Sequence, residues 1–186
     1  MKMSIYRISH NIEDFMFFTI DDLDVYDKME DFNIDGFGQP LTFKWVAPKA
    51  EFIPSDSGSE VLPDITQWNG SDLILNAKAK QLLDTALKKL GDFLPLGGAC
   101  KDNWLLNPIA RMGNEIVDPD KTTSAYFDDG SWEKLESLYF NDKAEKLAPC
   151  LFTLEIDRGV NLYCTEEFKS AIETNELQGL FYEKIN

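Results

Sequence analysis

The sequence predicts an α+β fold in which a mixed or antiparallel sheet is accompanied by two or three short helices. Three features of the 186 residues support this prediction. The first third contains short apolar runs separated by acidic loops, and residues 76–90 follow a helical pattern. Residues 151–185 then alternate strand-like and helix-like segments. We expect one compact unit with an acidic strand-and-loop part, residues 1–60, and an α+β part, residues 61–186.

Short strands are expected in the N-terminal third where β-branched and aromatic residues gather. These runs are "SIYRI" (4–8), "FMFFTI" (15–20) and "LTFKWVA" (41–47). The following segment, residues 48–64, is rich in Pro, Ser, Gly and acidic side chains. This composition predicts a surface connection.

The clearest helix follows the strand-like run "SDLIL". Asn76 can accept hydrogen bonds from unpaired backbone N–H groups at its start. Gly91 is expected to end it in a left-handed conformation, and Lys88 and Lys89 would complement the helix dipole. The apolar stripe of this helix is formed by Ala79, Leu82, Leu83, Ala86, Leu87 and Leu90.

The remaining elements are shorter. Thr165 is expected to cap a helix over 166–175. The run "SWEKLESLYF" (131–140) is compatible with either a strand or a helix. Strands are expected at 103–109, 115–118, 151–156, 161–164 and 179–185.

Charge limits the classes of partner. The chain has 33 acidic and 18 basic side chains, a net charge of −15. Nucleic acids and anionic membranes need a basic surface, so neither is an expected partner. A basic protein is expected instead, with fast and salt-sensitive association. The N-terminal residues lack the apolar region of a secretory signal, and no apolar run is long enough to span a membrane. The three cysteines form no disulfide framework. Together these features predict a cytoplasmic protein.

Catalytic and metal motifs are weak. His10 is the only histidine, which excludes paired-histidine zinc motifs, and it is more simply read as a surface or strand-end residue. Residues 118–129 have acidic side chains at positions that bind the ion in a calcium-binding loop. Thr123 occupies the position where that loop needs glycine, so a turn is the better interpretation. We therefore expect no enzymatic activity, no cofactor and no metal.

One acidic segment stands out near the N-terminus. Its seven carboxylates accompany a single base, Lys28. A solvated loop between two strands, a surface for a basic partner and a metal cage all fit this composition. Tyr26, Met29, Phe32 and Phe37 lie between the acids and would serve either as partner anchors or as the core side of the segment. The candidate partner-binding residues are Asp21, Asp22, Asp24, Asp27, Glu30, Asp31 and Asp35.

Residues 61–185 resemble an immunity protein family of bacterial polymorphic toxin systems, the Myxococcus-type family first described as a domain of unknown function. The resemblance lies in the order and pattern of the sequence elements. The pair Asp64-Ile65 precedes a strand and a capped helix at 73–90. A strand with the sequence "WLLN" and an element at 117–124 follow. The pattern ends with a strand at 177–181. One departure from the family pattern is the pair Thr122-Thr123 before Ser124, where the family is expected to have fewer residues.

The resemblance implies a cytoplasmic protein that neutralises a cognate toxin domain by occlusion and so protects the producing cell and its kin. A basic, nuclease-like toxin would suit the acidic surface. Glu166, Glu167 and Glu173 form a second candidate contact surface. Two alternatives are a hydrolase whose carboxylates meet only in space, and an adaptor or chaperone that binds a secreted effector outside its toxic domain.

Overall fold

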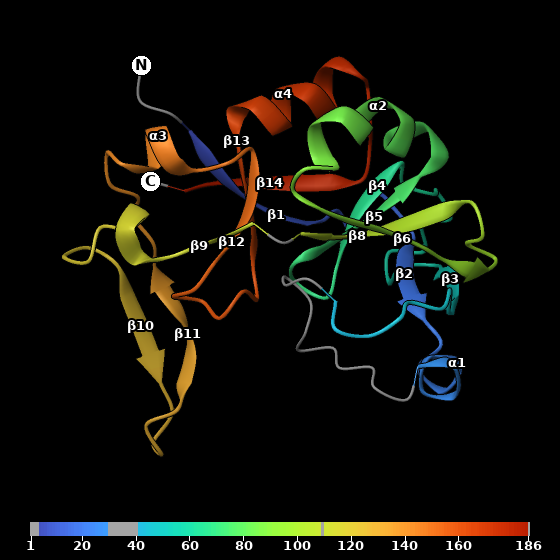
Figure 1. Cartoon of the computed structure of the whole chain (residues 1–186), viewed down its shortest axis with the longest axis horizontal. Coiled ribbons are helices and arrows are strands. Elements are labelled where there is room, and N and C mark those ends of the chain that lie inside the picture. Colours follow the sequence, from blue (N-terminus) through green and yellow to red (C-terminus); the bar gives the residue numbers. More distant parts are fainter. Residues whose placement is uncertain (1–3, 30–40, 109, 186) are drawn as a thin grey trace.

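The computed structural model describes residues 4–29, 41–108 and 110–185. Within these residues the chain forms four α-helices and several mostly antiparallel sheets (Figure 1). The predicted α+β class is confirmed, with more helices than the two or three expected.

The largest sheet joins the two ends of the chain. Strand β1 (Ile5–His10) lies between the terminal strand β14 (Leu180–Ile185) and β13 (Leu162–Thr165). The sheet continues through β12 (Leu151–Leu154) to β9 (Arg111–Met112), the only parallel neighbour in its described part. The N-terminal strand therefore depends on the C-terminal third for its hydrogen bonds.

A second sheet carries the strands around the predicted helix. Its order is β4 (Ile65–Trp68), β5 (Asp72–Asn76), β8 (Asn103–Pro108) and β6 (Gly91–Pro95). Helices α2 (Ala77–Leu87) and α4 (Glu166–Thr174) lie along the same side of the molecule (Figure 1). Both helices bury apolar side chains in one core with Leu73, Leu75 and Leu106. This burial provides most of the driving force for docking the helices on the sheets.

A third sheet packs on the opposite face of the second one. It consists of β2 (Phe17–Ile20), β3 (Lys49–Ile53) and the short β7 (Gly97–Gly98). Phe18 from this sheet shares a core with Ile74 and Leu105 from the second sheet. Helix α1 (Asp22–Lys28) follows β2 and joins the same core.

The remaining elements surround a third core. It includes Phe140, Phe152 and Tyr163, together with residues of η2 (Asn114–Ile116) and α3 (Ala144–Leu147). From this region β10 (Thr123–Tyr126) and β11 (Trp132–Ser137) extend as a two-stranded hairpin. The segment 131–140 therefore contributes a strand.

The start of the predicted helix is confirmed, and its end is not. The Asn76 side chain accepts from the Ala79 N–H at 2.9 Å. Helix α2 already ends at Leu87, so Lys88 and Lys89 follow it. Gly91 begins β6, where a Cβ atom would lie 2.3 Å from the Asn107 carbonyl oxygen. Close strand pairing explains this glycine better than a helix end does.

Other expectations were also wrong. Residues 41–47 form no strand; there the Trp45 indole donates to the Pro95 carbonyl at 2.8 Å. The strand lies instead at β3, inside the expected surface connection. Residues 114–116 form a 3₁₀ helix where a strand was expected. Thr165 is the N-cap of α4, but its side chain makes no capping hydrogen bond.

Candidate functional site

The first half of the acidic segment is helical and not a loop. Asp21 caps α1 by accepting from the backbone N–H groups of Leu23 and Asp24, each at 3.1 Å. Asp22 lies in the first turn, where negative charge is favoured by the helix dipole. The predicted residues Glu30, Asp31 and Asp35, like Phe32 and Phe37, lie outside the described residues.

Asp24 points inward and connects α1 to β3. Its side chain is 10% exposed, and its carboxylate lies 2.8 Å from Lys28 Nζ and 3.4 Å from Lys49 Nζ. The Lys49 backbone N–H also donates to it at 2.7 Å. The hydrogen bond from Lys28, followed by the one from the Lys49 backbone, lowers the pKa of this carboxyl. Asp24 thus has a structural role among the predicted contact residues.

The outer face of α1 combines apolar and acidic side chains. Leu23 is 77% exposed and Tyr26 is 67% exposed, one helical turn apart. Asp22 and Asp27 are exposed beside them. Met29 is buried in the core. Of the possible anchors, Tyr26 is therefore available to a partner and Met29 is not.

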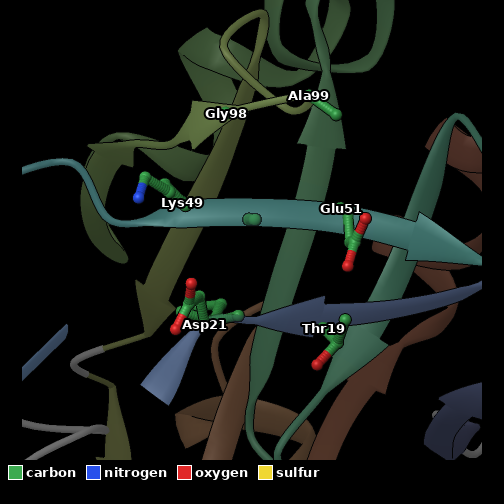
Figure 2. Close-up of a pocket in the computed structure, with 8 residues that line it drawn as sticks. Thr19, Asp21, Lys49, Glu51, Gly98 and Ala99 are labelled. Carbon is green, nitrogen blue, oxygen red and sulfur yellow. The ribbon is translucent and has the colours of Figure 1, made fainter. Parts of the chain in front are cut away.

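A hollow of about 390 Å³ lies beside the start of α1. Figure 2 shows Asp21 and Lys49 at one end of it and Thr19 and Glu51 at the other. Thr19 and Glu51 face each other across the β2–β3 ladder. Two carboxylates and one ammonium group give the lining a negative balance, so the hollow is suited to a lysine or arginine side chain of a partner.

The second candidate surface, on α4, is partly occupied by internal contacts. Glu166 accepts from the Tyr6 hydroxyl at 2.5 Å, and Glu173 pairs with Lys169 at 2.6 Å. Its acids are exposed, but two of the three already hold neighbouring side chains in place. This surface is less available than the outer face of α1.

The single histidine and the three cysteines lie in environments that disfavour their charged forms. His10 Nδ1 lies 2.5 Å from Thr66 Oγ1, and burial lowers the pKa of its ring. Burial raises the pKa of the Cys100 and Cys150 thiols to about 11, and that of Cys164 further still. Thiols with such pKa values are poor nucleophiles at neutral pH.

Asp72 was not recognised from the sequence as an unusual residue. It begins β5, opposite Trp68, and is fully buried. Neither carboxylate oxygen has a hydrogen-bond partner within the described part of the chain, and burial raises the pKa of this carboxyl well above its usual range. Such a carboxyl is typical of active sites, but a substrate cannot reach this one in the described conformation.

The described residues contain no group of three or more His, Cys, Asp or Glu side chains that could hold a metal ion. In the loop that resembles a calcium site, Asp118 accepts from the Asp120 N–H at 3.1 Å and pairs with Lys121 at 3.2 Å. These contacts form a turn closed by the Thr122 N–H, which donates to the Asp118 carbonyl at 3.0 Å.

No protein-family model matches the chain, and no curated protein matches it in sequence. Among the described helices, none has the length and apolar character needed to cross a membrane.

Proposed function

We propose that this chain is a cytoplasmic immunity protein that binds a cognate bacterial toxin and neutralises it by occlusion. The observation that carries the proposal is the outer face of α1, where exposed Leu23 and Tyr26 are flanked by the acids Asp22 and Asp27. Exposed aromatic and aliphatic side chains within a charged rim are the usual composition of a protein-binding surface.

Electrostatics favours a basic partner for this face. A net charge of −15 steers positively charged surfaces toward the protein and accelerates association. The hollow beside α1 offers Asp21 and Glu51 to a basic side chain of that partner. Toxins that cleave nucleic acid need basic clefts to hold phosphates, and carboxylates can occupy such clefts in place of phosphates. The toxin we expect is therefore basic and nuclease-like.

Inhibition by occlusion needs no catalytic group in the inhibitor. The high thiol pKa values and the inaccessibility of Asp72 agree with a protein that acts by binding. The resemblance of residues 61–185 to an immunity family adds support of a different kind, because it rests on the order of sequence elements and not on the α1 surface.

The first experiment is capture of the partner. The tagged protein would be used as bait in lysate of its own source cells, at low and high salt, and bound proteins identified by mass spectrometry. We expect one dominant protein whose C-terminal domain is basic and toxic when expressed alone, and whose retention falls at high salt. Co-expression with the chain should restore growth.

The contact surface is tested by reversing exposed charges whose structural role is limited to the helix dipole. The double variant Asp22→Lys/Asp27→Lys should weaken toxin binding by at least about 100-fold, because each close charge pair across an interface contributes about 1.5 kcal/mol or more. The matched control is Asp142→Lys/Glu145→Lys at α3, which changes net charge equally on exposed residues. Its effect should stay within about threefold, apart from a change in long-range steering.

Three results would argue against the proposal. Equal losses in the two double variants would show that only net charge matters and would remove α1 as the site. Binding without inhibition of the purified toxin would favour an adaptor or chaperone. Failure to protect cells that express the captured protein would remove the immunity function itself.

A further inference from the structure

The hairpin of β10 and β11 projects from the body of the protein (Figure 1). Its strands pair antiparallel from Thr123 with Ser137 to Tyr126 with Trp132. All residues from 123 to 137 are described, and none of them is buried. A two-stranded ribbon without a buried face is only marginally stable alone, so burial in the core does not explain this arm.

The hairpin is nevertheless held at both ends. At its base the Thr123 and Ser137 hydroxyl oxygens lie 2.9 Å apart, and Ser137 donates to the Lys121 carbonyl. At its tip Asp129 accepts from both the N–H and the hydroxyl of Ser131, at 2.8 and 2.6 Å. Gly130 adopts a φ of 81°, which the turn requires. These contacts favour the described conformation of the tip and so reduce the entropy lost on binding.

The tip presents two aromatic rings to solvent. Tyr126 is 62% exposed and Phe127 is 56% exposed, and Asp128 follows directly. The neighbouring Trp132 is held differently, since the Arg158 guanidinium lies 5.5 Å from its ring centre. Adjacent exposed aromatic residues on a rigid turn are efficient anchors, because they bury a large area at a small cost in side-chain entropy.

Charge selects the kind of partner that would cover these rings. Asp128 and Asp129 directly follow the aromatic pair in a protein of net charge −15. A second copy of the chain would bring like charges together, and nucleic acid would be repelled in the same way. An apolar pocket with lysine or arginine at its rim would accept the rings and pair with the acids.

We infer that the hairpin tip is a second anchor, which inserts Tyr126 and Phe127 into an apolar, basic-rimmed pocket of the same toxin that α1 binds. This inference rests on the proposed function. In Figure 1 the hairpin and α1 both extend toward the lower edge of the molecule, at its opposite ends. A partner lying along that edge would contact both, and two linked contacts increase affinity beyond either one.

Photo-crosslinking in the source cells tests the contact directly. The photoreactive residue p-benzoylphenylalanine would replace Phe127 in one variant, Tyr26 on α1 in a second and Phe181 on β14 in a third. Phe181 is the matched control because it is an aromatic residue of the same type with 57% exposure. We expect one toxin to be crosslinked from positions 127 and 26 and not from 181, through a peptide that contains apolar and basic residues.

Affinity measurements with the purified toxin complete the test. Phe127→Ser should weaken binding by about 30-fold, which corresponds to about 2 kcal/mol, as expected for an aromatic hot spot. Phe181→Ser should change it by less than about threefold, and Asp128→Lys should reduce the association rate and its salt dependence.

The outcomes separate the two proposals. Crosslinking to the toxin from position 26 but not from 127 overturns the hairpin contact and leaves the immunity function standing. Crosslinking from 127 only to a second copy of the chain, or to nothing, also overturns it. Crosslinking from both 127 and 26 to one basic protein that is not toxic removes the immunity function and leaves the two-anchor contact standing.

Discussion

Asp72 should lower the stability of the folded protein at neutral pH, and replacing it should therefore be stabilising. The carboxyl is fully buried at the start of β5, and neither oxygen has a hydrogen-bond partner among the described residues. Burial raises its pKa in the folded state, whereas the unfolded chain exposes an ordinary carboxyl. Folding at pH 7 thus requires either proton uptake or a buried charge.

The magnitude follows from the cost of an unsatisfied buried polar group, about 1–3 kcal/mol. Asp72→Val removes the polar group from a strand, so the free energy of unfolding should rise by about 1–3 kcal/mol at a pH where the carboxyl is protonated in both states, and by more at pH 7. For a chain of this size a rise of about 1–3 kcal/mol corresponds to roughly 2–12 °C in Tm. Asp72→Asn keeps an unsatisfied polar group but does not ionise, so at any one pH its gain should be smaller than that of Asp72→Val.

The dependence on pH identifies the cause. Below about pH 3 the carboxyl is protonated in both states, and Asp72 and its asparagine variant should have similar stability. As pH rises, the unfolded state loses this proton while the folded state keeps it, so the wild type loses stability relative to Asp72→Asn. The slope is about 1.4 kcal/mol per pH unit until the raised pKa is passed.

The assay is urea unfolding followed by circular dichroism from pH 4 to pH 8. Thr153→Val is a suitable control, because the Thr153 hydroxyl is also buried without a partner within the described residues but does not titrate in this range. Its effect should be independent of pH. A stability difference between wild type and Asp72→Asn that is constant from pH 4 to pH 7 would refute a neutral, buried Asp72.

Two further predictions concern the backbone and the thiols. Gly91→Ala should destabilise the fold by about 1–3 kcal/mol in thermal unfolding, because the new Cβ atom meets the Asn107 carbonyl. In the control Gly58→Ala the new Cβ atom has open space, so this variant should cost only the strain of its positive φ. Cys100 and Cys150 should react with a thiol reagent at pH 8 much more slowly in the folded protein than in urea, because burial raises the pKa of each thiol to about 11. Equal reaction rates in the two conditions would show that these thiols are not buried.

Elements with a strong apolar period could be predicted from the sequence. Helix α2 buries Ala79, Leu83 and Leu87, three members of the predicted stripe, and its Asn76 cap is confirmed. Strand β3 was missed because its alternation is only five residues long and lies among Pro, Ser and acidic residues that indicate a connection. Short strands depend on their neighbours for stability, and those neighbours are distant in sequence.

Helix α1 was missed for a related reason. The helix is seven residues long, and only Val25 of its residues is buried, with Met29 just beyond its end. Two inward positions give no recognisable period, whereas the acids give a clear signal for a charged surface. The position of Asp72 was equally invisible, because a carboxyl at the start of a strand resembles a turn residue until the packing around it is known.

The acidic segment illustrates why charge content alone does not locate a binding site. Asp21 caps the helix, and Asp24 joins it to Lys28 and Lys49. Reversing either charge would disturb α1 itself, so a loss of binding in such a variant would not identify a contact. Asp22 and Asp27 face solvent and can be changed with little effect beyond the helix dipole. The direction of each side chain, and not the number of acids, therefore decides which substitutions can test whether this surface binds a toxin.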